Sequence, residues 1–191
     1  MLGGMSPKPG APLPPPLPLP RDPSGPYRVC CVCLGNTCRS PMAEVVLRAR
    51  LTGATLQGRV IVDSAGTGNW HVGQPMNPPA RRQLERRGYD GAAHRGRQID
   101  ASWLAERDLL LAMNSSNLAT LRAFAGPDAT PDTVARIRLF GEVAGLDGAD
   151  VPDPWGGRAV EFARVRTMLE TGMARVVSEL RDVAGAAASE R

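Results

Sequence analysis

The sequence predicts an open α/β domain, in which a four-stranded parallel sheet is flanked by helices on both faces. Short apolar runs alternate along the chain with longer segments whose apolar residues recur every three or four positions. The 191 residues, 42% of them hydrophobic, suffice for one domain with a sizeable core. No apolar run approaches the roughly 20 residues that cross a bilayer, so a membrane-spanning protein is excluded and no membrane partner is expected.

Strands and helices alternate from residue 27 onward. The first strand, 27–33 (YRVCCVC), is a short β-prone run of the kind found in buried parallel strands, and it ends before the turn at Gly35 and Asn36. A helix is expected to follow from Ser40, which can cap it, with Pro41 in the first helical position. Apolar residues at steps of three and four predict a long helix over 162–183. The remaining expected elements are strands over 58–64, 107–113 and 135–140 and helices over 77–88 and 115–126.

The first 26 residues hold 10 of the 18 prolines. Proline at this density disfavours helices and sheets and favours an extended polyproline II backbone. We therefore expect a disordered tail over 1–26, a folded domain over 27–185 and a short tail over 186–191. The proline run can be a solvated extension, which we favour, or a ligand for an aromatic groove. Because the tail lacks the features of a signal peptide, we expect a cytoplasmic protein.

All four cysteines lie between Cys30 and Cys38, which excludes a disulfide framework that staples distant loops. A zinc site is not expected either, because His71 and His94 are far apart in the sequence and from the cysteines. The cluster therefore indicates a reducing compartment and a special thiol. Cys30 and Cys31 are most simply packing residues of the strand.

The segment from Cys33 to Ser40 places a cysteine after a strand, then five residues, then an arginine at a helix N-terminus. Gly35 and Asn36 can adopt positive φ, so the backbone N–H groups of the loop can converge on an anion. Arg39 offers a planar fork for two phosphoryl oxygens, and the same positive field favours the thiolate of Cys33. The pattern thus predicts a phosphate-binding loop with a nucleophile. A buried core cysteine beside a surface arginine is the alternative.

These residues resemble the low-molecular-weight protein-tyrosine phosphatase family. The likeness extends over four segments in order, VCLGNTCRSPMAE (32–44), DSAGTGNWHVG (63–73), HRGRQ (94–98) and VPDPW (151–155). The resemblance implies that Cys33 is the nucleophile, that Arg39 binds the phosphoryl group and that Asp153 is the general acid and base. An acid held between two prolines on a stiff loop suits that role. No metal or other cofactor is implied.

The resemblance also assigns supporting roles. It implies that the loop residues Leu34, Gly35, Asn36, Thr37 and Cys38 surround the phosphate together with Ser40. Ser40 would bind the sulfur of Cys33, and Asn36, Ser64 and His94 would brace the loop. Trp70 and Trp155 would wall the cleft and sandwich a phenyl ring. Cys38 would be the redox partner that protects Cys33 through a reversible disulfide.

Several functions remain open beside phosphotyrosine hydrolysis. Thr37 and the stretch after Asp153 resemble protein-arginine phosphatases, and a non-catalytic phosphoanion-binding module is a less favoured alternative. Arsenate reductases with a cysteine cascade need cysteines after Cys38, and this chain has none. A net charge of +4 with few aromatic residues disfavours nucleic acid. The expected partners are tyrosine-phosphorylated proteins, and a cognate tyrosine kinase is a further candidate.

Overall fold

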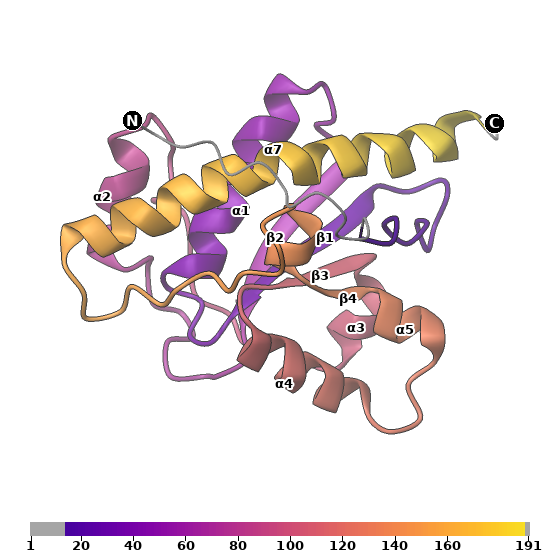
Figure 1. Ribbon diagram of the computed structural model, residues 1–191, viewed down its shortest axis with the longest axis horizontal. Coiled ribbons are helices and arrows are strands. Elements are labelled where there is room, and N and C mark those ends of the chain that lie inside the picture. Colours follow the sequence, from indigo (N-terminus) through magenta and orange to yellow (C-terminus); the bar gives the residue numbers. More distant parts are fainter. Residues whose placement is uncertain (1–13, 190–191) are drawn as a thin grey trace.

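A computed structural model describes residues 14–189, with side chains described as far as residue 185. Four parallel strands form one sheet in the order β2-β1-β3-β4, as Figure 1 shows. The strands are β1 (Tyr27–Cys33), β2 (Val60–Gly66), β3 (Leu109–Ala112) and β4 (Ile137–Leu139). The predicted fold class, an open α/β sheet, is confirmed.

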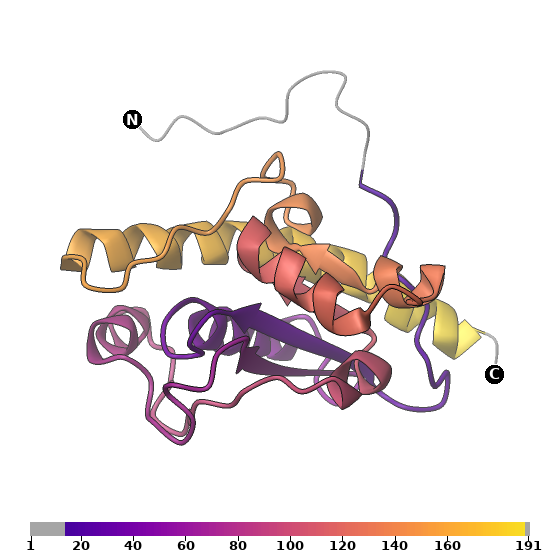
Figure 2. The same ribbon diagram turned by 90° about the horizontal axis from the view of Figure 1, so that it is seen from below.

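Seven helices are found in the described part of the chain. They are α1 (Arg39–Gly53), α2 (Pro78–Glu85), α3 (Ser102–Glu106), α4 (Ser115–Ala125), α5 (Pro131–Ala135), α6 (Phe140–Val143) and α7 (Ala159–Ser189). The long α7 extends across most of the molecule and packs against α1 (Figures 1 and 2). No helix in the region that the structure describes is long and apolar enough to cross a membrane.

The sheet is largely buried on both faces, which explains why most residues of its strands are apolar. Successive side chains of a strand point to opposite faces. In β1, Val29, Cys31 and Cys33 join the larger core together with apolar residues of α1 and α7. Cys30 and Val32 face the opposite side and pack in a second core with residues of β3, β4 and α4.

The carboxyl ends of the strands bring distant loops together. The N–H of Thr67, after β2, donates to the carbonyl of Cys33 at 2.9 Å, and the N–H of Val151 donates to the carbonyl of Met113 at 2.8 Å. The first contact joins the ends of β1 and β2, and the second brings the loop that bears Asp153 to the end of β3. Ligands of open α/β sheets bind at this edge.

Several predicted boundaries differ from the structure. β2 extends to Gly66, two residues beyond the expected end, and β4 keeps only three residues. The helix expected over 77–88 ends at Glu85, and three short helices, α3, α5 and α6, were not predicted. Ser40 does not cap α1, because the helix begins at Arg39 and the hydroxyl of Ser40 turns to Cys33.

The ends of the chain also differ from the expectation. Residues 14–26 form no helix or strand, yet they contact the domain, and Leu17 is buried in the larger core. A disordered tail therefore does not describe these residues, because the domain supplies them with an apolar site and hydrogen-bond donors. Residues 1–13 lie outside the described part of the chain. At the other end, α7 continues to Ser189, past the expected boundary at residue 185.

Candidate active site

The loop between β1 and α1 curls around the sulfur of Cys33. Asn36 adopts a φ of 52°, in the left-handed region that Asn tolerates better than most residues. The N–H of Asn36 then points back and donates to Cys33 Sγ at 3.3 Å. Ser40 Oγ lies 3.0 Å from the same sulfur. Two polar groups therefore face the sulfur, and both can donate a hydrogen bond to a thiolate.

The end of β2 supports this loop through close backbone contact. A Cβ atom added to Gly66 would lie 2.7 Å from the carbonyl oxygen of Leu34 and 3.1 Å from the nitrogen of Asn36. Only a residue without a side chain allows this approach. Gly66 thus lets the loop lie directly on the second strand.

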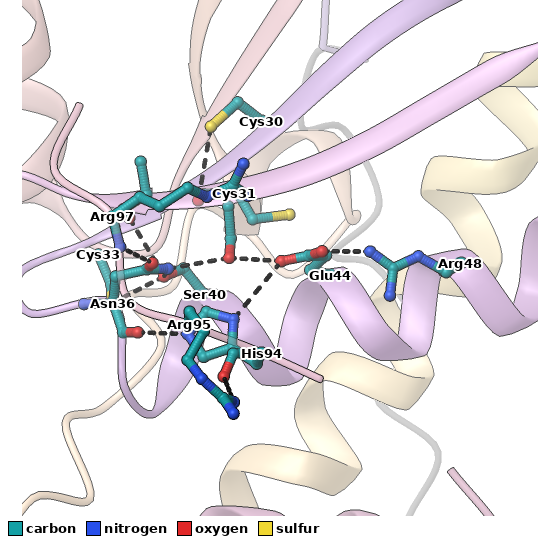
Figure 3. Close-up of polar contacts among 12 residues, drawn as sticks. Cys30, Cys31, Cys33, Asn36, Ser40, Glu44, Arg48, His94, Arg95 and Arg97 are labelled. Atoms are coloured by element: carbon teal, nitrogen blue, oxygen red, sulfur yellow. Dashed lines mark hydrogen bonds and ion pairs between the residues drawn. The ribbon is translucent and has the colours of Figure 1, made fainter. Parts of the chain in front are cut away.

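A buried polar network holds the loop from behind, as Figure 3 shows. The side-chain amide of Asn36 donates to Ser40 Oγ and to Ser64 Oγ, both at 2.9 Å. Ser64 in turn donates to Glu44 Oε2 at 2.6 Å. Glu44 is 7% exposed, and its other oxygen pairs with Arg48 at the surface. The network connects the residues around Cys33 to an ion pair on α1.

His94 and Arg97 complete the brace from the loop that follows α2. His94 Nε2 donates to the carbonyl of Asn36 at 2.8 Å, and the N–H of Arg97 donates to Asn36 Oδ1 at 2.8 Å. Burial lowers the pKa of His94, a shift that its bond to Asn36 and the nearby Glu44 oppose. Asn36 is therefore held by its carbonyl, its side-chain oxygen and its amide nitrogen, which fixes the strained turn.

Arg39 and Asp153 meet across the mouth of the loop. Arg39 Nη2 donates to Asp153 Oδ2 at 2.5 Å, and the N–H of Trp155 donates to the other carboxylate oxygen at 3.1 Å. Arg39 is 2% exposed, and its Nε and Nη1 are buried and have no hydrogen-bond partner among the described residues. A buried guanidinium with free donors favours an anion, because unpaired buried donors are costly.

A cavity of about 190 Å³ opens over the loop. Its walls come from three separate segments of the chain: Cys33, Leu34, Gly35, Thr37, Cys38, Arg39, Trp70, His71, Asp153 and Trp155. The ring of His71 lies on Trp155 with centroids 5.0 Å apart, and Gln74 Oε1 holds His71 Nδ1 at 2.8 Å. Both tryptophans remain more than half exposed, at 64% for Trp70 and 56% for Trp155. Flat aromatic walls over an anion site suit an aryl phosphate.

The other thiols differ from Cys33 in their surroundings. Burial raises the pKa of Cys38 to about 12, against the opposing effect of a bond from Thr37. Cys30 and Cys31 are fully buried in the two cores, and this burial raises the pKa of both thiols well above the usual range. All four cysteines are free thiols. No group of three or more potential ligands is placed to hold a metal ion among the residues that the structure describes.

The structure brings the predicted site residues together in two layers. Cys33, Arg39, Asp153, Thr37, Cys38 and the two tryptophans line the cavity, whereas Asn36, Ser40, Ser64 and His94 lie behind the loop. The sequence analysis missed Glu44, His71 and Arg97. Glu44 lies four residues after Ser40 on α1, and that spacing is the one sequence signal that places it on the face toward the loop.

A cysteine held by N–H and O–H groups beside a buried arginine and a carboxylate, at the carboxyl ends of a parallel sheet, defines a phosphoanion site with a thiol nucleophile. The family model for low molecular weight phosphotyrosine protein phosphatase matches residues 28–184. The chain belongs to this family and is therefore a phosphoric monoester hydrolase.

Known relatives agree with this assignment. The chain is 39% identical to a low molecular weight protein-tyrosine-phosphatase of Streptomyces coelicolor, over 82% of this chain and 94% of the relative. It is 38% identical to protein-tyrosine phosphatase A of Mycobacterium tuberculosis, over 78% of this chain and 89% of the relative.

Solved structures share the fold. A protein tyrosine phosphatase from Entamoeba histolytica aligns with a TM-score of 0.75 and 29% identity, over 82% of this chain and 97% of that one. The arginine phosphatase YwlE, solved as a mutant with a phosphorylated active-site serine, aligns with a TM-score of 0.73 and 25% identity over 81% and 96%.

Proposed function

We propose that this chain hydrolyses phosphotyrosine in proteins through a cysteinyl-phosphate intermediate. The observation that carries the proposal is the position of Arg39. Two of its donors, which have no partner within residues 14–189, are buried in the wall of the cavity that also contains Cys33 and Asp153. The aromatic walls of that cavity suit the phenyl ring of tyrosine, and the named relatives are tyrosine phosphatases.

The reaction proceeds in two steps. The phosphoryl group enters and takes the place of the Asp153 carboxylate at Arg39, and the freed carboxylate takes up a proton from water, so that Asp153 becomes a carboxylic acid. Cys33 then attacks phosphorus, the bond to the tyrosine oxygen breaks, and Asp153 donates a proton to that oxygen. In the second step water attacks the phosphocysteine, Asp153 accepts its proton, and Cys33 leaves as a thiolate that Ser40 and Asn36 stabilise.

No step requires a metal, because Arg39 and the N–H groups of the loop supply positive charge to the equatorial oxygens. The network behind the loop keeps those groups in place before the substrate arrives. Such preorganisation means that little reorganisation is needed as charge develops in the transition state.

The replacement of Cys33 by serine tests the mechanism. Cys33→Ser is expected to abolish hydrolysis of p-nitrophenyl phosphate while inorganic phosphate still binds, because Arg39 and the loop remain. The matched control is Cys30→Ser, a thiol of the same strand that faces the second core. Full activity of Cys33→Ser would contradict the proposal.

Phosphoarginine is the second candidate substrate, and Thr37 favours it. Thr37 is 5% exposed, its carbonyl accepts from the N–H of Asn77, and it lines the cavity. The fold neighbour YwlE is named an arginine phosphatase. The rates on phosphotyrosine and phosphoarginine peptides should be compared in the wild type and in Thr37→Ile. We expect phosphotyrosine to be the better substrate of both; a preference for phosphoarginine that Thr37→Ile abolishes would reverse the assignment.

We also propose a redox guard and a cellular setting. If peroxide oxidises Cys33 to a sulfenic acid, the thiol of Cys38 displaces water and forms a disulfide with it, which thiol reductants reverse. The four free cysteines suit a reducing compartment, so we propose a cytoplasmic protein. Its partners would be tyrosine-phosphorylated proteins and a cognate tyrosine kinase.

A further inference from the structure

We propose that the domain contains a recognition groove for a polyproline II segment, and that residues 14–21 of this chain are its occupant. We call these residues the strap. The groove lies near the amino ends of β1, β3 and β4, whereas Cys33 lies at the carboxyl end of β1. The strap precedes the residues that match the family model, which begin at residue 28.

The burial of the strap follows a period of three. Leu17 is 6% exposed and belongs to the larger core, while Pro14 and Pro20, three residues before and after it, are half-buried. Pro16 and Leu19 are exposed, Leu19 at 67%. A polyproline II helix has three residues per turn, so one of its edges faces the domain and another faces water.

The domain holds the strap through its carbonyl groups. Tyr27 Oη donates to the carbonyl of Pro18 at 3.0 Å. Arg136 Nη1 donates to the carbonyl of Leu19 at 3.0 Å, and both terminal nitrogens of Arg138 lie 3.4 Å from the carbonyl of Pro15. A polyproline II segment makes no internal hydrogen bonds, so its carbonyls are free to accept. Grooves that bind proline-rich ligands in other domains are likewise lined by aromatic residues.

The two arginines that bind the strap are buried beneath it. Arg136 is 5% exposed and Arg138 is 8% exposed, and both lie on or beside the edge strand β4. Arg136 pairs with Asp132, but the acceptor that the structure describes for Arg138 is the carbonyl of Pro15. Both exposures are those of the docked state, so release of the strap would exchange these hydrogen bonds for bonds to water.

Arg21 fixes the far end of the strap. Its backbone N–H donates to Asp108 Oδ1 at 2.6 Å, and its guanidinium donates to the carbonyls of Leu104 and Arg107 at 3.0 and 3.2 Å. Asp108 is 3% exposed, and its other oxygen accepts from the N–H of Arg28 at 2.7 Å. One buried carboxylate therefore joins the strap to the first strand.

A matched pair of full-length variants tests the proposal. Leu17→Glu places a charge on the buried edge of the strap, and Leu19→Glu places the same charge on its exposed edge. Trypsin cleavage after Arg21 reports release, because a docked Arg21 has its backbone and side chain held. Cleavage of Leu17→Glu is expected to be about 10- to 100-fold faster than that of the wild type, because the variant loses the free energy of burying one leucine. Cleavage of Leu19→Glu should proceed at the wild-type rate.

Binding in trans is the second measurement. A labelled peptide with the sequence of residues 14–22 is expected to bind Leu17→Glu saturably and to bind the wild type weakly, because there the strap fills the groove. The same peptide with glutamate in place of Leu17 is expected not to bind. Hydrolysis of p-nitrophenyl phosphate should be the same in both variants and the wild type, since the groove is far from Cys33.

Equal cleavage rates in the two variants, or the absence of saturable peptide binding to Leu17→Glu, would overturn the proposal. If Leu17→Glu does not fold, Tyr27→Phe replaces it, since that change removes only the hydroxyl that binds Pro18. Cleavage after Arg21 should then rise about 2- to 10-fold, the value of one hydrogen bond. An unchanged rate in Tyr27→Phe would equally contradict the assigned groove.

Discussion

The role of Asp153 as general acid gives a quantitative prediction for Asp153→Ala. In the free protein one oxygen of this carboxylate lies 2.5 Å from Arg39 Nη2, and the other accepts from the N–H of Trp155 at 3.1 Å. The carboxylate therefore faces the cavity above Cys33. A lost general acid typically lowers turnover by about 10²- to 10⁴-fold. At about 1.36 kcal/mol for each factor of ten, the barrier would rise by about 2.7 to 5.4 kcal/mol.

The size of this loss should depend on the leaving group. The assay measures kcat/KM, which reports the first step, for a series of aryl phosphates whose phenols range from tyrosine-like to strongly acidic. Because an acidic phenol leaves without a proton, the effect of Asp153→Ala should shrink along the series. Asp150→Asn is the matched control: Asp150 accepts from Ser115 at 2.8 Å outside the cavity, and its variant should keep wild-type rates.

Asp153→Ala should also bind inorganic phosphate more tightly than the wild type. The carboxylate of Asp153 competes with an anion for Arg39, and a half-exposed ion pair is worth about 0.2 to 1 kcal/mol. The inhibition constant for phosphate should therefore fall about 1.5- to 5-fold. A loss of kcat/KM that is uniform across the aryl phosphates, together with weaker phosphate binding, would refute the reasoning and indicate a damaged loop.

Three further predictions concern Trp155 in the cavity wall, His94 behind the loop and the thiol of Cys38. Trp155→Ala should raise KM for p-nitrophenyl phosphate about 2- to 10-fold with kcat nearly unchanged, because a ring contact is worth about 0.5 to 1.5 kcal/mol; an unchanged KM would remove Trp155 from the cleft. Burial lowers the pKa of His94 below its unfolded value, so the unfolded state binds the proton first and stability should fall as the pH drops below about 6.5. Between pH 7 and pH 5 the free energy of urea unfolding should fall less in His94→Asn than in the wild type. An equal fall would contradict the lowered pKa assigned to His94. Because burial raises the pKa of Cys38 to about 12, iodoacetamide at pH 8 should leave native Cys38 unmodified. After treatment with peroxide and then a thiol reductant, Cys38→Ala should recover less activity than the wild type. Equal recovery would argue against the redox guard.

The sequence predicted the sheet well because its signals are local. The run from Tyr27 to Cys33 is apolar and short, and the structure places the first strand over those same residues. The turn at Asn36 could be anticipated because few residues other than glycine adopt positive φ. The short helices α3, α5 and α6 could not be anticipated, because elements of four or five residues show no periodicity.

The parts of the site that the sequence did not reveal depend on contacts between distant segments. Glu44 appears as an ordinary residue of a helix, and only the approach of Ser64 and His94 makes it a buried acceptor. His71 lies in the wall of the cavity against the ring of Trp155, a residue far along the chain, and no local sequence pattern indicates that contact. The strap was misjudged for the same reason, because proline content describes a segment but not the arginines that bind its carbonyls.

The phosphocysteine itself provides the most direct test of the central claim. Asp153→Ala is mixed with p-nitrophenyl phosphate, whose acidic phenol keeps the first step fast while the hydrolysis of the intermediate is slow. The account predicts a burst of about one phenol for each active site and, after an acid quench, phosphate on the peptide that contains Cys33. Steady turnover without a burst, or phosphate on another residue, would contradict it.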